Sequence, residues 1–232
     1  MPYRRLMMLS FLWVAAAVAQ TPPAEYATFM SQGKAVSCAV YDSRDATATM
    51  ILLRGSDPAL ARLQARFFAE HGFRVLLPDY LSVTSTAELS VGNYRRWAQV
   101  VQDMVTALRS RNRKTVLAGE DLGATVALVA GSQRVGVDAI AEWSGLLPNQ
   151  FFSQVRTLPP LLILHGEQDQ QVPVVNARQL VRLCELKDFT CEAGIYPGEG
   201  HVFTSRARDS ANQRALTFFR TYLWANLPKR AE

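Results

Sequence analysis

The sequence predicts an α/β protein built on a doubly wound, mostly parallel sheet. Short apolar runs alternate with amphipathic segments of helical period along most of the chain. Strands separated by helices in this way form parallel sheets with right-handed crossovers and helices on both faces. The composition agrees, because 49% hydrophobic and 19% charged residues over 232 positions can fill one substantial core and exclude a disordered, collagen-like or coiled-coil chain.

Residues 1–19 are predicted to be a signal peptide. Two arginines within the first five residues precede fourteen residues without a charge, and an Ala-Val-Ala triplet ends at Ala19, where a signal peptidase would cut. Fourteen residues are too few to cross a bilayer, which needs about 20 in a helix. We therefore expect one domain at 20–232 and an exported protein, periplasmic or extracellular, without stable membrane association after cleavage. An uncleaved membrane anchor is the alternative.

The first two strands are expected at 35–42 and 46–54. The first run alternates and the second is almost continuously apolar, and both are rich in residues that favour strands. The turn-like residues 43–45 between them favour an antiparallel edge pair.

A helix with clear end signals follows. Ser56 or Asp57 caps its N-terminus, Pro58 lies in its first turn, and Gly72 ends it. Its inward face is expected to consist of apolar residues at helical spacing, namely Leu60, Leu63, Phe67 and Phe68.

The alternation continues to the end of the chain. Further strands are expected at 73–80, 114–119, 137–143, 160–166 and 189–197. Helices begin near Tyr94, at Ala124 and at Pro173, and a last helix follows the final strand. The inward positions of three of these helices follow the helical period and are Trp97, Val100, Val101, Met104, Val105 and Leu108, then Ala177, Leu180, Val181 and Cys184, then Ala215, Phe218, Phe219, Tyr222 and Leu223.

Three cysteines in an exported chain permit one disulfide. Cys184 and Cys191 are close enough in sequence to close a short loop, which would leave Cys38 unpaired, and three reduced thiols are the alternative. Their spacing fits no standard metal site, and the chain has no glycine-rich phosphate loop. We expect neither a metal nor a cofactor.

The formal net charge is +5 and falls to +3 once the two arginines of the signal peptide are removed. The remaining basic residues are scattered except for a cluster at a helix end, Arg109, Arg111, Arg113 and Lys114. Such a cluster complements the helix dipole, and no interleaved aromatic residues suggest a base-stacking surface. A nucleic acid partner is not expected, and the sequence leaves the oligomeric state open.

The loop after the strand at 114–119 carries the first candidate for catalysis. It reads Gly119-Glu120-Asp121-Leu122-Gly123 and stands between an apolar strand and an apolar helix. A nucleophile elbow has this context, because strand and helix approach too closely there for side chains at the two glycine positions. Asp121 is therefore the candidate nucleophile, and a simple helix N-cap is the alternative.

Two later loops supply the other candidates. Asp169 follows the strand at 160–166, where a carboxylate can orient an imidazole. His201 lies in the glycine-flanked loop after the last strand. The two other histidines fit better as a surface residue, His71, and a structural residue, His165. Because parallel strands end at one edge of the sheet, these loops are expected to meet at Asp121.

The chain resembles the dienelactone hydrolase branch of the α/β-hydrolase superfamily. The order Asp121, Asp169, His201 matches the order of nucleophile, acid and base in that superfamily. FFAEHGFRVLLPDY is similar to its helix-to-strand stretch, and LLILHGEQDQQVP and YPGEGHVF resemble its acid and histidine loops. The resemblance implies an α/β-hydrolase fold. Only 16 residues, 144–159, stand where epoxide hydrolases and haloalkane dehalogenases usually carry a helical cap, so no large cap domain is expected.

The resemblance also implies an oxyanion hole and a small-molecule substrate. The backbone N–H groups of Leu122 and Ser56 would form the hole. Tyr80, Trp143 and Phe203 are plausible pocket walls.

The family expects Cys or Ser where this chain has Asp121, and three functions remain open. One is a small hydrolase of dienelactone hydrolase type that cleaves an ester, lactone or related molecule through Asp121, His201 and Asp169. Another is an Asp-nucleophile hydrolase of epoxides or haloalkanes, since a carboxylate attacks saturated carbon better than an ester carbonyl. The last is a catalytically silent binding module.

Overall fold

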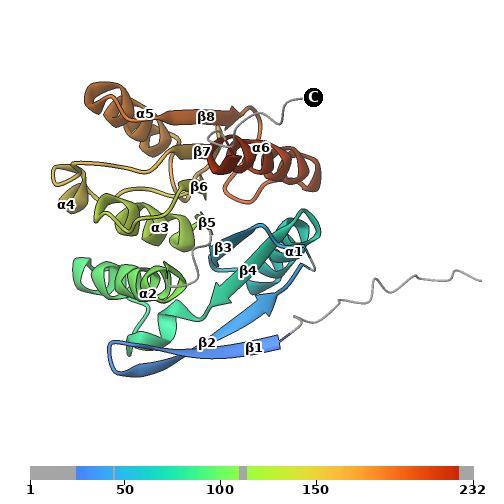
Figure 1. Ribbon diagram of the computed structural model, residues 1–232. Helices are drawn as coiled ribbons and strands as arrows, with labels where there is room; N and C mark the ends of the chain where they lie inside the picture. The colour runs from blue at the N-terminus through green and yellow to red at the C-terminus, as the bar shows by residue number, and fades with distance from the viewer. Residues whose placement is uncertain (1–24, 44, 110–113, 225–232) are drawn as a thin grey trace, which may run out of the picture.

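An eight-stranded sheet organises the computed structural model, which describes residues 25–43, 45–109 and 114–224 (Figure 1). The strand order is β1-β2-β4-β3-β5-β6-β7-β8, and all neighbours from β4 to β8 are parallel. The strands are β1 Glu25–Ser31, β2 Lys34–Tyr41, β3 Ala48–Leu53, β4 Phe73–Pro78, β5 Lys114–Glu120, β6 Ala139–Trp143, β7 Leu161–Gly166 and β8 Cys191–Tyr196. The predicted doubly wound, mostly parallel α/β fold is confirmed.

Helices cover both faces of this sheet (Figure 1). They are α1 Pro58–Glu70, the 3-10 turn η1 Tyr80–Val83, α2 Val91–Arg109, α3 Leu122–Ser132, the short α4 Asn149–Phe152, α5 Val175–Lys187 and α6 Ser205–Trp224. Helices α1 and α6 pack on one face, and α2, α3 and α5 on the other. The segment between β6 and β7 contains only α4, so the described chain carries no large cap there.

The expected antiparallel pairing of 35–42 with 46–54 is wrong. Strand β2 pairs antiparallel with β1, through a turn whose Gln32 and Gly33 have φ angles of 50° and 75°, and with β4 on its other side. Strand β3 lies between β4 and β5, because every one of its positions is buried and a strand buried on both faces belongs inside the sheet. Strand β1 was not predicted, since most of its residues are exposed.

Helix α1 begins as predicted, but its inward face matches the expected one only in part, since Phe68 is buried while Leu60 and Phe67 are half-buried. Asp57 is its N-cap and accepts hydrogen bonds from the first-turn N–H groups, and Gly72 follows its end with a φ of 93°. The expected inward residue Leu63 is 54% exposed. Its buried stripe is Ala61, Gln64, Ala65 and Phe68.

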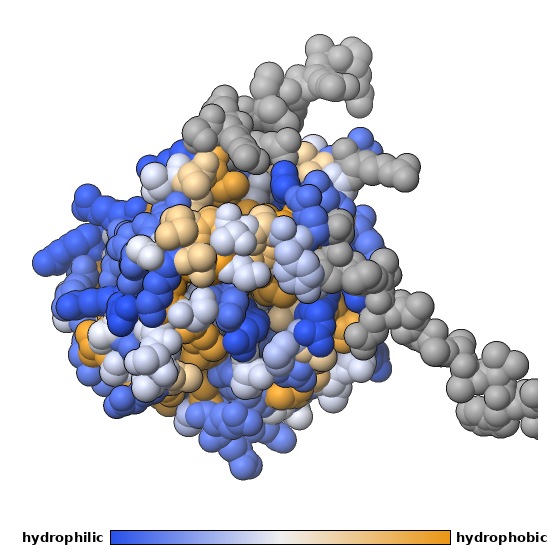
Figure 2. Space-filling model, turned by 90° about the horizontal axis from the view of Figure 1, so that it is seen from below, coloured by the Kyte–Doolittle hydropathy of each residue, from blue (hydrophilic) through white to orange (hydrophobic). Residues whose placement is uncertain are grey.

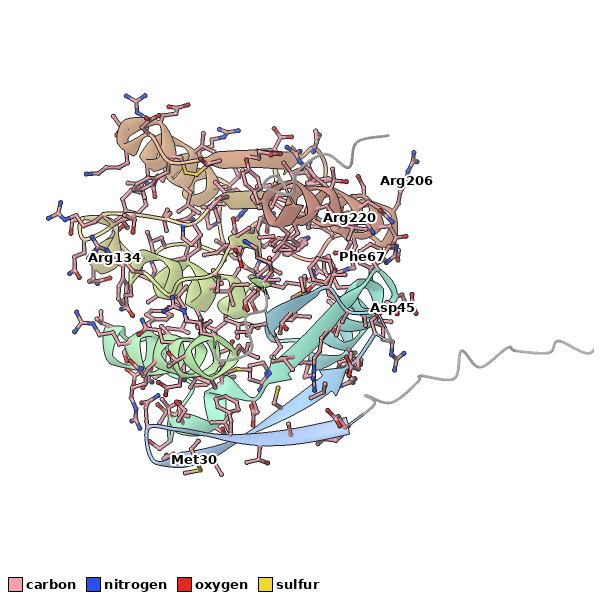
Figure 3. All side chains as sticks on the ribbon, viewed as in Figure 1. Met30, Asp45, Phe67, Arg134, Arg206 and Arg220 are labelled. Atoms are coloured by element: carbon pink, nitrogen blue, oxygen red, sulfur yellow. A yellow bond between two sulfur atoms is a disulfide. The ribbon has the colours of Figure 1, made fainter. Side chains whose placement is uncertain are left out.

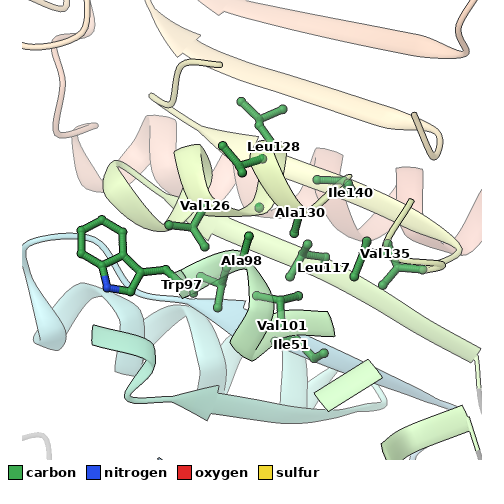
Figure 4. Close-up of a cluster of buried hydrophobic side chains, with 14 of the residues drawn as sticks. Ile51, Trp97, Ala98, Val101, Leu117, Val126, Leu128, Ala130, Val135 and Ile140 are labelled. Carbon is green, nitrogen blue, oxygen red and sulfur yellow. The ribbon is translucent and has the colours of Figure 1, made fainter. Parts of the chain in front are cut away.

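The larger part of the core lies between the sheet and helices α2 and α3. Trp97 of α2 is fully buried, as are Ile51 and Leu117 of the sheet and Val126 of α3 (Figure 4). Most of the predicted inward positions of α2, α5 and α6 are buried, while Leu108, Val181 and Tyr222 are half-buried. This packing fixes the carboxyl ends of β5, β6 and β7, where the candidate site lies.

Cys184 and Cys191 form a disulfide that joins the end of α5 to the start of β8. The predicted pairing is thereby confirmed, and Cys38 is a buried free thiol. The predicted signal peptide lies outside the described residues, as do Arg111 and Arg113 of the basic cluster.

Within the described part of the chain, no helix combines the length and apolarity needed to span a bilayer. Polar and apolar residues are interspersed on the face seen from below (Figure 2). The labelled arginines Arg134, Arg206 and Arg220 extend into solvent (Figure 3).

Candidate active site

Asp121 forms the whole connection between β5 and α3. Its backbone has φ 55° and ψ −119°, a conformation that costs a non-glycine residue free energy. Gly119 and Gly123 flank it because a Cβ on Gly119 would overlap the backbone of Gly123, and one on Gly123 would overlap the carbonyl of Leu53. The predicted elbow is therefore present. The N-cap alternative is wrong, since the Asp121 side chain makes no capping hydrogen bond to α3.

The two oxygens of the Asp121 carboxylate have different partners. Oδ2 accepts a hydrogen bond of 3.1 Å from the backbone N–H of Ser56. Oδ1 lies 3.5 Å from His201 Nε2. Burial opposes ionisation, but the close contact with His201 and the hydrogen bond from Ser56 outweigh it and hold the pKa of Asp121 below its usual value. Asp121 is thus a carboxylate at neutral pH, with one oxygen on a backbone donor and the other beside an imidazole.

His201 is held from its other side by Asp169. Nδ1 of His201 lies 2.9 Å from Oδ2 of Asp169, which confirms the prediction that the two residues are hydrogen-bonded. The second carboxylate oxygen, Oδ1, accepts the backbone N–H groups of Gln171 and Val172 at 2.9 and 2.8 Å. These bonds leave the Asp169 side chain completely buried and fixed in direction.

The two carboxylates control the charge of His201. The 3.5 Å contact with the Asp121 carboxylate contributes most to raising its pKa, burial opposes the rise, and the hydrogen bond with Asp169 adds to it, so that the pKa reaches about 9. At neutral pH the ring is therefore an imidazolium between two carboxylates. An imidazolium donates protons and cannot accept one, so His201 acts as a base only after Asp121 has lost its negative charge.

A second imidazole touches the acid. His165 is fully buried, and its Nε2 lies 2.7 Å from the carbonyl oxygen of Val172 and 3.3 Å from Asp169 Oδ2. A carbonyl oxygen only accepts, so Nε2 carries the proton and the ring holds both ends of the 169–172 turn. His165 was predicted to be structural, but its contact with Asp169 was not predicted. The sequence did contain a signal for this contact, because His165 stands at the end of a buried strand, directly before the loop that carries Asp169.

The end of β6 links the elbow to the histidine loop. The carbonyl of Trp143 accepts the N–H of Asp121 at 2.9 Å. The next residue, Ser144, has a φ of 55°, and its hydroxyl donates a 3.1 Å bond to the carbonyl of His201. Ser144 was not among the residues predicted from the sequence. Positive φ at a serine is not visible in a sequence, although the Ser-Gly pair after a buried strand marks a sharp turn.

Glu142, immediately before this turn, was also not predicted from the sequence. It is fully buried in β6, and its Oε2 accepts the N–H of Gly145 at 2.8 Å. Burial raises its pKa to about 8, although the bond from Gly145 opposes the rise, so the carboxyl group is neutral at neutral pH. Its neighbours in the strand are all apolar, and periodicity therefore predicted only a core strand.

An ion pair fixes the elbow to α6. Arg208 of α6 donates from one nitrogen to both oxygens of Glu120, at 3.0 and 3.2 Å, and both side chains are nearly buried. Glu120 directly precedes Asp121, so this contact restrains the strained turn from the face opposite α3.

The space in front of Asp121 is small. A cavity of about 20 Å³ lies between residues 55–57, the elbow and the loop of His201 and Val202. A water needs roughly 10 to 15 Å³ of such volume, so the cavity fits about one water, and Val202 in its wall is 58% exposed.

The predicted aromatic walls lie elsewhere. Tyr80 packs on Trp97 and donates its hydroxyl to the carbonyl of Arg54. Trp143 and Phe203 are buried in the core, and neither they nor Tyr80 line this cavity. These three large side chains therefore pack in the hydrophobic core and do not form walls of the candidate site.

Of the two predicted oxyanion donors, Ser56 bonds to Asp121 itself. Leu122 is the first residue of α3, where a backbone N–H has no partner within the helix. Within the described residues, no group of three or more His, Cys, Asp and Glu side chains is gathered in a way that would hold a metal ion.

A protein-family model of the dienelactone hydrolase family matches residues 53–223. The chain belongs to the dienelactone hydrolase family. The match covers every element from the end of β3 to α6, and so includes Asp121, Asp169 and His201. A comparison of the chain with curated proteins found no match.

Solved structures of hydrolases share the fold of this family member. A Klebsiella pneumoniae subsp. pneumoniae MGH 78578 protein described as a dienelactone hydrolase superposes with a TM-score of 0.72 at 14% identity, over 85% of this chain and 98% of that one. Esterase 2 of Thermogutta terrifontis, phosphoramylated by tabun, gives 0.72 at 16% identity over 85% and 94%. Esterase PE8 gives 0.66 at 20% identity over 81% and 99%. At these identities the likeness establishes the α/β-hydrolase fold.

Proposed function

We propose that this family member is an exported hydrolase of a small molecule, and that Asp121, His201 and Asp169 are its catalytic residues. The observation that carries the proposal is that the two oxygens of the Asp121 carboxylate have different partners. Oδ2 accepts a hydrogen bond from the N–H of Ser56, and Oδ1 lies beside His201. The substrate class is an ester, a lactone or a related strained oxygen compound such as an epoxide. The bond that breaks is the one between oxygen and a saturated carbon.

The preference for saturated carbon follows from where the oxygens of Asp121 lie. Attack on a carbonyl carbon would form an anhydride, which is no more stable than the substrate, and the donor Ser56 that should bind the developing oxyanion is occupied by Oδ2. Attack of Oδ1 on a saturated carbon forms an alkyl ester of Asp121 instead. The carbon–oxygen bond of the substrate breaks, and its electron pair stays on the leaving oxygen.

His201 has a role in this first step because it is protonated. An alkoxide released from an epoxide takes the imidazolium proton, whereas a carboxylate released from a lactone needs no proton. The raised pKa of His201 is therefore useful only while Asp121 is charged.

The second step uses the same residues in a changed state. Esterification removes the negative charge of Asp121, the contact that contributes most to the pKa of His201, and the ring then becomes a neutral base. It accepts a proton from a water that attacks the carbonyl carbon of the Asp121 ester. The oxyanion that forms is Oδ2, already on the N–H of Ser56 and within the elbow that also presents the N–H of Leu122. Collapse expels the alcohol, which takes the proton back from His201.

Asp169 keeps the imidazole in place through both steps. Its two backbone bonds and its burial orient one oxygen toward Nδ1 of His201, and this leaves Nε2 directed at Asp121. His165 and Ser144 hold the acid turn and the His201 backbone respectively.

Export is supported by the disulfide between Cys184 and Cys191, since such bonds persist in oxidising compartments. The charge and apolar pattern of residues 1–19 supplies the signal. Sequencing the N-terminus of the protein secreted by a bacterial host tests this part, with Gln20 expected first. Recovery of the uncut chain in the membrane fraction would contradict it.

A binding module without turnover is the second candidate. It is favoured by the small cavity, which fits about one water beside Asp121. In that case the charged pair of Asp121 and His201 would serve stability alone.

The experiment is a single turnover in ¹⁸O-labelled water on a panel of epoxides, lactones and esters, with chain 20–232. Water that attacks the Asp121 ester leaves its label in the carboxylate, so the first product is unlabelled and the peptide containing Asp121 gains mass. His201→Gln should accumulate the alkyl ester, and Asp121→Asn should lose turnover by orders of magnitude. Label in the first product together with an active Asp121→Asn would refute the nucleophile, and no turnover of any panel member would favour the binding module.

A further inference from the structure

A second cavity lies on the same face of the sheet as α2 but at the opposite edge from the active site. Its volume is about 210 Å³, and it opens between α2 and the strands β1, β2, β3 and β4. The strands β1 and β2 pass beneath α2 in Figure 1. Thr49 and Arg74 stand near the starts of β3 and β4, whereas Asp121 follows the carboxyl end of β5.

Most of this cavity wall is apolar. The apolar part consists of Phe29, Val40, Leu76, Met104, Leu108 and two alanines, Ala27 and Ala107. The thiol of Cys38 also faces the cavity, and burial raises its pKa to about 12, so that it is neutral. A wall of this composition suits an aliphatic chain rather than a sugar or a nucleotide.

Two polar groups are placed side by side at one point of the wall. Thr49 and Arg74 are register partners on the adjacent strands β3 and β4, so their side chains project from the same face. Thr49 is 1% exposed, and its hydroxyl has no hydrogen-bond partner. A buried hydroxyl without a partner costs free energy, and folded proteins rarely leave one without a reason.

Arg74 brings a positive charge to the same place. Its guanidinium donates one bond of 3.1 Å to Glu25, and three quarters of the side chain is shielded from solvent. A guanidinium has five N–H donors, so it can bind a second carboxylate while it stays paired with Glu25. Arg74 and Thr49 together provide the donors that an anionic head group needs.

We propose that this cavity binds a straight-chain monocarboxylate of six to eight carbons, with its carboxylate on Arg74 and Thr49 and its chain against Leu76 and Met104. The volume supports this size, since about 210 Å³ is about ten times the 20 Å³ of the cavity beside Asp121, which fits about one water, and so suits a ligand of about ten non-hydrogen atoms. The proposal is independent of catalysis at Asp121.

The test is calorimetric titration of the chain 20–232 with sodium hexanoate, and then with octanoate, acetate and hexylamine. Hexanoate should bind with one site per chain. Acetate should bind far more weakly, because each buried methylene contributes about a fourfold gain. Hexylamine carries the wrong charge for Arg74 and should not bind.

Variants locate the site. Arg74→Gln should weaken hexanoate binding by about tenfold or more, since it removes a charge-assisted contact. Glu25→Gln should strengthen binding by removing the competing carboxylate. Thr49→Val should weaken binding and yet raise the melting temperature of the ligand-free protein, because it replaces an unpartnered hydroxyl with a methyl group of similar shape. The matched control is Arg182→Gln, which removes an exposed paired arginine elsewhere and should change nothing.

The outcomes separate the proposal from its alternatives. Binding of hexanoate that survives Asp121→Asn and falls in Arg74→Gln supports it. Equal binding of hexylamine and hexanoate, an unchanged affinity in Arg74→Gln, or loss of binding in Asp121→Asn would overturn it. Circular dichroism of each variant shows whether it is folded, and Glu25→Gln tests the site by a gain even if Arg74→Gln is unstable.

Discussion

The charge of His201 provides the sharpest test of the candidate site, and Asp121→Asn is the change that tests it. In the wild type the pKa of His201 rises from 6.5 to about 9, a difference on the order of 3 kcal/mol between the two protonation states. The contact with Asp121 contributes most to this rise. Asparagine keeps the shape of the side chain and removes its charge, so the pKa of His201 should fall. The contact with Asp169 should still keep this pKa above 6.5.

The same shift predicts how stability depends on pH. A folded-state pKa above the unfolded value means that the folded state binds the proton more tightly. The stabilisation is therefore fully present below pH 6.5 and is lost as the pH rises through about 9. Wild type should lose on the order of 3 kcal/mol more of its unfolding free energy between pH 6 and pH 10 than His201→Gln does. Other groups that titrate in this range are common to both proteins and cancel in the comparison.

The assay is an NMR titration of the histidine ring signals, with urea unfolding at the two pH values. The chain has three histidines, so single substitutions assign every signal. Burial holds the pKa of His165 below its usual value, which makes that ring an internal contrast. A wild-type His201 that titrates at or below pH 6.5, or a titration that Asp121→Asn leaves unmoved, would refute the charged pair and with it the two-step mechanism.

Three further predictions concern residues around the site. Glu142→Gln mimics the neutral carboxyl, so wild type should lose several kcal/mol of unfolding free energy relative to the variant as the pH rises from 4.5 through about 8, measured by urea unfolding. Ser144→Ala should cost about 1 kcal/mol by removing the bond to His201, whereas Ser144→Gly should cost less because it also relieves the positive φ; equal losses would contradict this. Replacing Cys184 and Cys191 together by serine should cost about 2 kcal/mol in thermal unfolding, and no loss would mean that the bond adds nothing to the fold.

Much of the fold was predictable because its signals are local. Apolar runs in a parallel sheet are buried on both faces, so they stand out in the sequence, and the elbow is encoded by two glycines whose absence of Cβ is sterically required. The meeting of Asp169 and His201 followed from one topological rule, that parallel strands end at one edge.

The remaining features depend on contacts between distant segments. Beside β1, strand β2 pairs with β4 rather than with the nearby β3, and nothing in these strands specifies that choice without the rest of the sheet. Helix α1 has two apolar stripes, and the sequence cannot show that Gln64 is buried because it bonds to Asn212 of α6. The contacts of polar residues inside apolar strands, such as Glu142 and His165, could not be predicted for the same reason.

The residue at the elbow sets three properties of the site together, which leads to a prediction for Asp121→Ser. Removing the carboxylate supplies a hydroxyl nucleophile, frees the N–H of Ser56 for a substrate oxyanion, and lowers the pKa of His201 so that its ring can act as a base. Wild type lacks all three features of acyl transfer and should not hydrolyse p-nitrophenyl acetate above background. Asp121→Ser should gain esterase activity, and Asp121→Ser combined with His201→Gln should lose it again. If the serine variant stays inactive while NMR shows a neutral His201, the family's acyl-transfer geometry is absent from this chain, and the aspartate cannot be the single change that separates it from an esterase.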